Sequence, residues 1–66
     1  MNPMTLAEYL KRNGLTREQF ARKIKVQEMS VYRYLAGRFP EKKVLVRIIK
    51  VTGGKVTADS FLRRAA

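Results

Sequence analysis

Apolar residues recur along this chain at intervals of three and four, which is the spacing of amphipathic helices. Residues that favour the start or the end of a helix divide the pattern into five short segments. Thr5 and Thr16 are each followed three residues later by Glu or Gln, as in a capping box, and glycines end the first and third segments. Pro40 is suited to the first position of the fourth helix, and Thr57 can cap the last one. The pattern predicts five helices, which with their caps span 5–13, 16–24, 28–37, 40–52 and 57–62.

The segment 44–52 is rich in the β-branched residues typical of strands, and Gly53-Gly54 behind it could form the turn of a hairpin. Strict alternation of apolar and charged residues fails there, however. Helical spacing places the basic residues, Arg47 among them, on the side away from the core and leaves only Val46 misplaced. We therefore expect an all-α fold, a compact domain of five helices. The alternative is an α+β fold with a C-terminal β-hairpin.

The composition of the 66 residues excludes several classes of protein. There is no cysteine and no histidine, which excludes disulfides, Cys/His metal sites, thiol nucleophiles and histidine acid–base chemistry. The five acidic residues are scattered, so we expect neither an enzyme nor a cofactor. No apolar run reaches the roughly 18 residues of a membrane span, and the first residues lack the features of a secretion signal. We expect a single domain over 1–66, in a cytoplasmic protein without a membrane partner.

The charge balance points to a polyanionic partner. Fifteen Lys and Arg residues against five Asp and Glu residues give a formal net charge of +10. The basic residues alternate with apolar helix positions along the chain, so they belong to a folded surface and not to a disordered basic tail. Nucleic acid is the commonest polyanion in a cell, and we therefore expect nucleic-acid binding.

Residues 16–37 have the organisation of a helix-turn-helix, in which two short helices flank a three-residue turn. Ala21 is small where the two helices would cross most closely, and Val31 and Tyr34 are spaced to anchor the second helix in the core. A row of exposed side chains then remains at the start of the second helix, on a basic domain. A protein that reads the major groove of DNA requires such a row. The row consists of Gln27, Glu28, Met29, Tyr32 and Arg33. The alternative is an ordinary helical hairpin with a polar outer face.

The stretch TREQFARKIKVQEMSVYRYLAGRFP resembles the helix-turn-helix of the phage Cro/repressor family, also called the XRE family. The following stretch, IIKVTGGKVTADSFL, resembles the helix–Gly-Gly–helix ending of small Cro-like and YdaS-like regulators of prophages and bacteria. Together the resemblance extends from Thr5 to Leu62. It implies an all-α fold of five helices, DNA binding without a cofactor, and transcriptional regulation, commonly as a repressor.

Two residues depart from the pattern of that family. Lys25 occupies a turn position that is usually glycine because the backbone there tends to positive φ, and lysine adopts this conformation at a cost of about 1 kcal/mol. Gln27 stands where the family often has serine or threonine as the cap of the recognition helix, and it is a poorer cap. Glu28 in the first turn partly compensates through the helix dipole.

The exposed row suggests roles in base reading through its chemistry. Arg33 can pair with O6 and N7 of guanine, with a phosphate contact or a surface salt bridge as the alternative. Gln27 can read adenine or touch the DNA backbone. Glu28 can accept from N4 of cytosine, or it can cap the helix and repel other sequences. Met29 and Tyr32 can press on a thymine methyl or on a sugar.

Phosphate contacts are expected from the rim of the helix-turn-helix and from the start of the next helix. Backbone amides and the helix dipole favour a phosphate at the start of the second helix. Basic residues in the turn and after the recognition helix add the charge on which affinity for DNA depends. The expected phosphate contacts are Thr16, Arg17, Lys25, Arg38, Lys42 and Lys43.

These features predict a sequence-specific transcriptional regulator, namely a Cro-like repressor of phage or prophage type. Its expected partner is a double-stranded DNA operator, and its expected location is the nucleoid of a bacterial or phage-infected cell. One alternative is an antitoxin that represses its own operon and has a toxin as its protein partner. Another is a nucleoid-type or RNA binder with little sequence preference, which the few exposed aromatic residues disfavour. We expect a monomer or weak homodimer that pairs on DNA, with contact surface from Val46, Phe61 and Leu62.

Overall fold

The computed structural model describes residues 4–62, which form five helices and contain no strand. The helices are α1 (Leu6–Asn13), α2 (Arg17–Ile24), α3 (Glu28–Ala36), α4 (Lys42–Val51) and α5 (Ala58–Leu62). The prediction of an all-α fold is confirmed. The alternative with a C-terminal hairpin is wrong, because helical spacing buries Val44, Ile48 and Thr52 together on one face of this segment.

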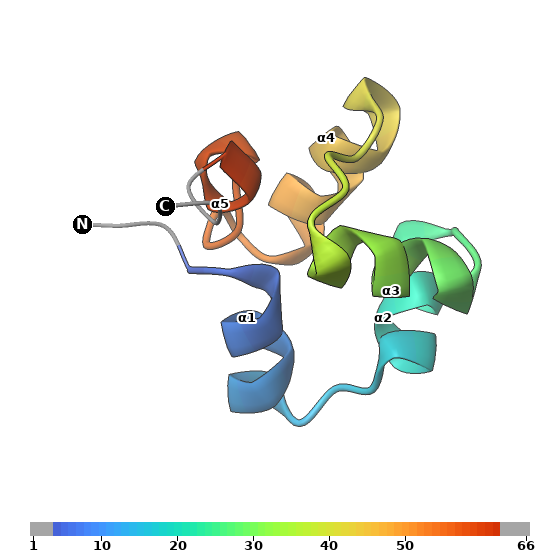
Figure 1. Ribbon diagram of the computed structural model, residues 1–66. Coiled ribbons are helices and arrows are strands. Elements are labelled where there is room, and N and C mark those ends of the chain that lie inside the picture. Colours follow the sequence, from blue (N-terminus) through green and yellow to red (C-terminus); the bar gives the residue numbers. More distant parts are fainter. Residues whose placement is uncertain (1–3, 63–66) are drawn as a thin grey trace.

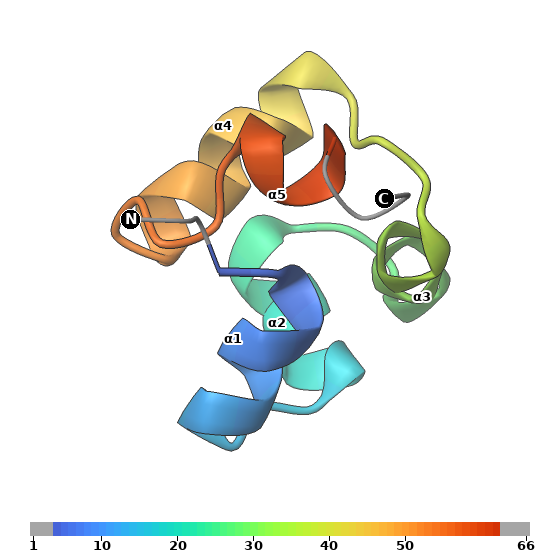
Figure 2. The same cartoon turned by 60° about the vertical axis from the view of Figure 1, so that its left-hand side comes forward.

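The core lies where α2 meets its neighbours. Figures 1 and 2 show α1, α2 and α3 on one side of the molecule, with α4 and α5 across from them. Phe20 and Ile24 of α2 are fully buried. The Phe20 ring packs edge to face with the ring of Tyr9 in α1, with 6.1 Å between the ring centroids. Ala21 is 2% exposed, as expected for a small residue at the crossing with α3. Val31, Ile48 and Val56 are also fully buried.

Both predicted capping boxes are present. The Thr5 hydroxyl accepts from the Glu8 N–H at 3.1 Å, and the Glu8 carboxylate accepts from the Thr5 N–H at 3.0 Å. Hydrogen bonding to the Glu8 carboxylate, first from the Thr5 backbone N–H and next from the Thr5 side chain, holds the pKa of Glu8 below its ordinary value. Thr16 and Gln19 form the same reciprocal pair at the start of α2, at 3.1 and 2.9 Å. These four hydrogen bonds satisfy amides that a helix start otherwise leaves without partners.

The start of α4 differs from the prediction for Pro40. The helix begins at Lys42, with Glu41 as an extended N-cap residue, so Pro40 lies before the cap and outside the helix. Pro40 is also buried. Its missing N–H therefore does not mark the first position of this helix, as the prediction had assumed.

Val46 is the off-face residue of α4, as the spacing predicted, and its side chain is 43% exposed. Replacing Val46 by alanine should leave the free energy of unfolding unchanged or raise it by up to about 0.6 kcal/mol, because alanine is the better helix former. Thermal and urea unfolding followed by circular dichroism would measure this. A loss of more than about 1 kcal/mol would show that Val46 contributes packing that the structure does not assign to it.

The start of the described chain is fastened to the segment around α5. The Met4 N–H donates to the Lys55 carbonyl at 2.9 Å, and the Ser60 hydroxyl donates to the Met4 carbonyl at 2.6 Å. Thr57 precedes α5 as predicted, and its N–H donates to the Ser60 hydroxyl at 3.1 Å. In the turn before it, the buried Thr52 hydroxyl accepts from the Val56 N–H at 3.1 Å. Side-chain hydroxyls therefore organise this end of the fold.

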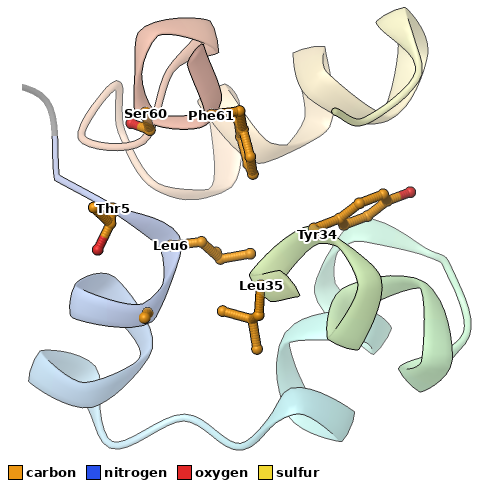
Figure 3. Close-up of a pocket in the computed structure, with 7 residues that line it drawn as sticks. Thr5, Leu6, Tyr34, Leu35, Ser60 and Phe61 are labelled. Atoms are coloured by element: carbon orange, nitrogen blue, oxygen red, sulfur yellow. The ribbon is translucent and has the colours of Figure 1, made fainter. Parts of the chain in front are cut away.

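A partly open cavity of about 200 Å³ lies between α1, α3 and α5. Figure 3 shows Leu6, Leu35 and Phe61 directed toward it from these three helices. Its polar edge contains Thr5 and Ser60, whose hydroxyls are already engaged in the hydrogen bonds described above. Within residues 4–62, no buried side-chain polar atom lacks a hydrogen-bond partner.

Candidate nucleic-acid interface

α3 lies at the edge of the molecule, with one side toward the core and the other open. Figure 2 shows it nearly end-on, at the right-hand edge of the molecule. Val31 is fully buried and Tyr34 is 8% exposed, whereas Met29 and Tyr32 are 56% and 50% exposed. All five predicted base readers are exposed on this helix or its cap, namely Gln27, Glu28, Met29, Tyr32 and Arg33.

The turn between α2 and α3 contains the strained position that the sequence indicated. Lys25 has φ 60° and ψ 46°, and it is the one residue other than glycine with positive φ among residues 4–62. Its N–H donates to the Arg22 carbonyl at 3.3 Å, which ends α2. Next to it, a guanidinium nitrogen of Arg47 donates to the Ile24 carbonyl at 3.4 Å. Arg47, predicted to face away from the core, therefore bends back over the end of α2 and is only partly exposed.

Side chains from two helices form a cluster at the beginning of α3. Gln27 is the N-cap residue and makes no side-chain capping bond, as expected for a poor cap. The Glu28 carboxylate instead lies 3.5 Å from the guanidinium of Arg17, the first residue of α2. The same guanidinium lies over the ring of Tyr32, at 5.3 Å from its centroid. Arg17 was predicted to contact phosphate, and the structure places it against two of the predicted base readers.

The exposed side of α3 divides into two hollows. One, toward the start of α2, is lined by Arg17, Glu28, Met29 and Tyr32. The other, toward the loop before α4, is lined by Ser30, Arg33, Tyr34, Arg38, Phe39 and Glu41. Arg33 is therefore separated from Glu28 and Tyr32 around the helix, and it shares its hollow with Arg38, a predicted phosphate contact. The two hollows differ in chemistry. One combines an arginine–glutamate ion pair with two large apolar side chains, and the other contains two arginines and one glutamate.

The predicted phosphate contacts are all exposed: Thr16, Arg17, Lys25, Arg38, Lys42 and Lys43. The backbone N–H of Thr16 donates to the side chain of Gln19 and is not available to a phosphate. The Thr16 hydroxyl accepts from Gln19 and keeps its own proton as a donor. A phosphate at this helix start would meet that hydroxyl and the amides of the first turn.

α4 presents a basic surface wider than the sequence predictions covered. Its hollow is lined by Glu41, Lys42, Lys43, Val46, Arg47 and Lys50. Only Lys42 and Lys43 were predicted to approach DNA. The spacing of Lys43, Arg47 and Lys50 at four and three residues indicated this stripe, although a solvated helix face has the same pattern.

Other kinds of site have little support in the described part of the chain. Between Met4 and Leu62, no group of three or more Asp, Glu, His or Cys residues could hold a metal ion. No helix in that range is long and apolar enough to cross a membrane. The surfaces around α3 and α4 therefore remain the strongest candidate for a binding function.

The chain matches a family model in the comparison with protein families. A family model described as helix-turn-helix matches residues 6–58, which extends from the first residue of α1 to the first residue of α5. Neither the curated proteins nor the solved structures contained a match. The matched range includes both hollows of α3, the turn at Lys25 and the whole of α4.

Proposed function

Because the chain belongs to the XRE-type helix-turn-helix family, a family of regulators that bind double-stranded DNA, we propose that it is a sequence-specific repressor of the Cro-like, phage or prophage type. In this proposal α3 enters the major groove. The exposed row from Gln27 to Arg33 reads base edges, and the basic residues around it contact phosphates.

The observation that supports base reading best is the chemistry of the exposed side of α3. A binder without sequence preference needs charge alone, which lysines supply. This helix instead exposes an acid, two large apolar side chains and an arginine in two separate hollows. A carboxylate facing DNA is repelled by phosphates, and it is useful where it accepts a hydrogen bond from a base.

Competition binding tests this proposal. A site enriched from random duplexes by repeated selection is compared with a scrambled duplex of the same composition at fixed salt. We expect the selected site to bind at least about 10³-fold more tightly, as specific regulators do. Equal affinities would overturn sequence-specific regulation and support a nucleoid-type binder.

We further propose that two copies pair on the operator, because a single α3 reads too few base pairs to select one genomic site. The Cα radius of gyration is 10.5 Å and the principal extents are 27 × 22 × 19 Å. Two copies in successive major grooves, about 34 Å apart, would therefore meet only along an edge. Leu62 is 65% exposed and Phe39 is 46% exposed with its ring against Phe61, so this corner offers apolar contact. Val46 is less suitable, since cations surround it.

The free protein should sediment as a monomer at micromolar concentration, because each copy carries +10 and the available contact is small. A full operator should bind two copies at least about tenfold more tightly than two independent half-sites would. Analytical ultracentrifugation and gel-shift titration of full and half operators measure both. A stable dimer at nanomolar concentration, or independent half-sites, would contradict pairing on DNA.

A further inference from the structure

The hollow formed by Arg17, Glu28, Met29 and Tyr32 combines two kinds of recognition in one place. The sequence predicted that Glu28 accepts from N4 of cytosine or caps the helix, and that Met29 and Tyr32 press on a thymine methyl or on a sugar. In the structure these side chains line the same hollow. Met29 and Tyr32 are each at least half exposed, so the hollow is open to a ligand.

The chemistry of the hollow restricts which base fits it. An ionised carboxylate only accepts hydrogen bonds, and cytosine offers the N4 amino group in the major groove, whereas thymine offers the O4 acceptor. Thymine would thus place its acceptor against Glu28, although its methyl suits the apolar wall. Unmodified cytosine satisfies Glu28 and leaves that wall without a partner. A cytosine with a methyl at C5 satisfies both.

We propose that this hollow recognises 5-methylcytosine in the operator, with Glu28 accepting from N4 and with Met29 and Tyr32 packing on the C5 methyl. The inference rests on the proposed function, since it requires α3 in the major groove. Arg17 is the positioning residue: its guanidinium holds the Glu28 carboxylate at 3.5 Å and covers the Tyr32 ring at 5.3 Å. It also compensates the negative charge that Glu28 brings toward the phosphates.

The test uses the selected operator, with each cytosine in turn replaced by 5-methylcytosine or by thymine, and affinities measured at fixed salt. We expect one position in each half-site at which methylation raises affinity about fourfold, the effect of burying one methyl group. Thymine at that position should bind more weakly than 5-methylcytosine. If no position responds to methylation while the operator is still preferred over scrambled DNA, the inference fails and the proposed function stands. Loss of that preference overturns the proposed function itself.

Variants assign the effect to the hollow. Met29→Ala should abolish the gain from methylation and keep the preference for cytosine over thymine, whereas Glu28→Gln should weaken that preference. Arg33→Ala is the matched control, because Arg33 lies in the other hollow and its loss should leave the methylation ratio unchanged. If deoxyuridine in place of a neighbouring thymine removes affinity that depends on Met29, the methyl belongs to that thymine and the inference is overturned.

Arg17→Ala separates positioning from phosphate contact. A positioning role predicts that both the methylation ratio and the preference for cytosine over thymine fall toward one. A phosphate contact predicts that the salt dependence of binding flattens by about one unit while both ratios stay as they were. The second result would overturn the role given to Arg17.

Discussion

Replacing Phe20 by alanine should lower the free energy of unfolding by about 3–5 kcal/mol, which is most or all of the stability of a domain this small. Phe20 of α2 is fully buried in the core, and its ring packs edge to face with the ring of Tyr9 in α1. Its removal leaves a cavity where α2 meets its neighbours, and the short helices have no other core to join. Circular dichroism against temperature and urea should show a mostly unfolded protein at room temperature.

Phe39→Ala is the matched control, since it deletes the same atoms from a side chain that is 46% exposed. It should reduce stability much less, because a half-exposed ring loses less burial and leaves no enclosed cavity. The Phe39 variant should therefore keep a cooperative transition. Similar small losses in both variants would contradict the placement of α2 at the centre of the core.

Arg33→Ala should weaken binding to the operator by about 1–3 kcal/mol and relax the preference at one base pair. Lys43→Ala should instead weaken binding to all sequences similarly and reduce the salt dependence by about one unit. The contrast follows from position, because Arg33 lies on the exposed side of α3 and Lys43 in the first turn of α4. Affinities for the operator and for its single-base variants at several salt concentrations measure both effects.

A uniform loss across sequences for both variants would remove Arg33 from the base readers. That outcome would identify Arg33 as a phosphate contact, which is also the role predicted for Arg38 in the same hollow. Helical content must be unchanged in each variant for the comparison to hold. Both side chains are exposed, so neither substitution should disturb the core.

The local features of this fold could be predicted from the sequence because they depend on residues close together in the chain. The capping boxes that begin at Thr5 and Thr16 require residues three apart, and the spacing of apolar residues separates the core face of each helix from its outer face. Positive φ at Lys25 could also be predicted, although from family resemblance and not from the preference of lysine. The boundaries of the helix-turn-helix follow from these signals.

The contacts that could not be predicted join residues distant in sequence. The Ser60 hydroxyl reaches the Met4 carbonyl across 56 positions, and Arg47 reaches Ile24 across 23. Pro40 is also buried, and α4 begins two residues after it, which the sequence did not indicate. No spacing rule carries such information, because each contact exists only after the helices have docked.

The residues of the candidate site could be predicted from the sequence, but the way in which they group into two hollows could not. Helical spacing predicted five outward-facing residues on α3 and its cap, and all five are exposed in the structure. The division into two hollows depends on Arg17 from α2 and on the loop before α4, which spacing within α3 cannot indicate. Their roles toward DNA remain predictions that the experiments above test.

The fastening of Met4 to Lys55 and Ser60 has a consequence for hydrogen exchange. Amides outside helices and strands usually exchange with solvent almost freely, because such segments open easily. The Met4 amide, however, donates to the Lys55 carbonyl, while the Met4 carbonyl accepts from Ser60. Its proton should exchange only when Met4 and the segment around α5 separate. The exchange rate at this one amide would thus report how often these two segments part while the rest of the described fold stays closed.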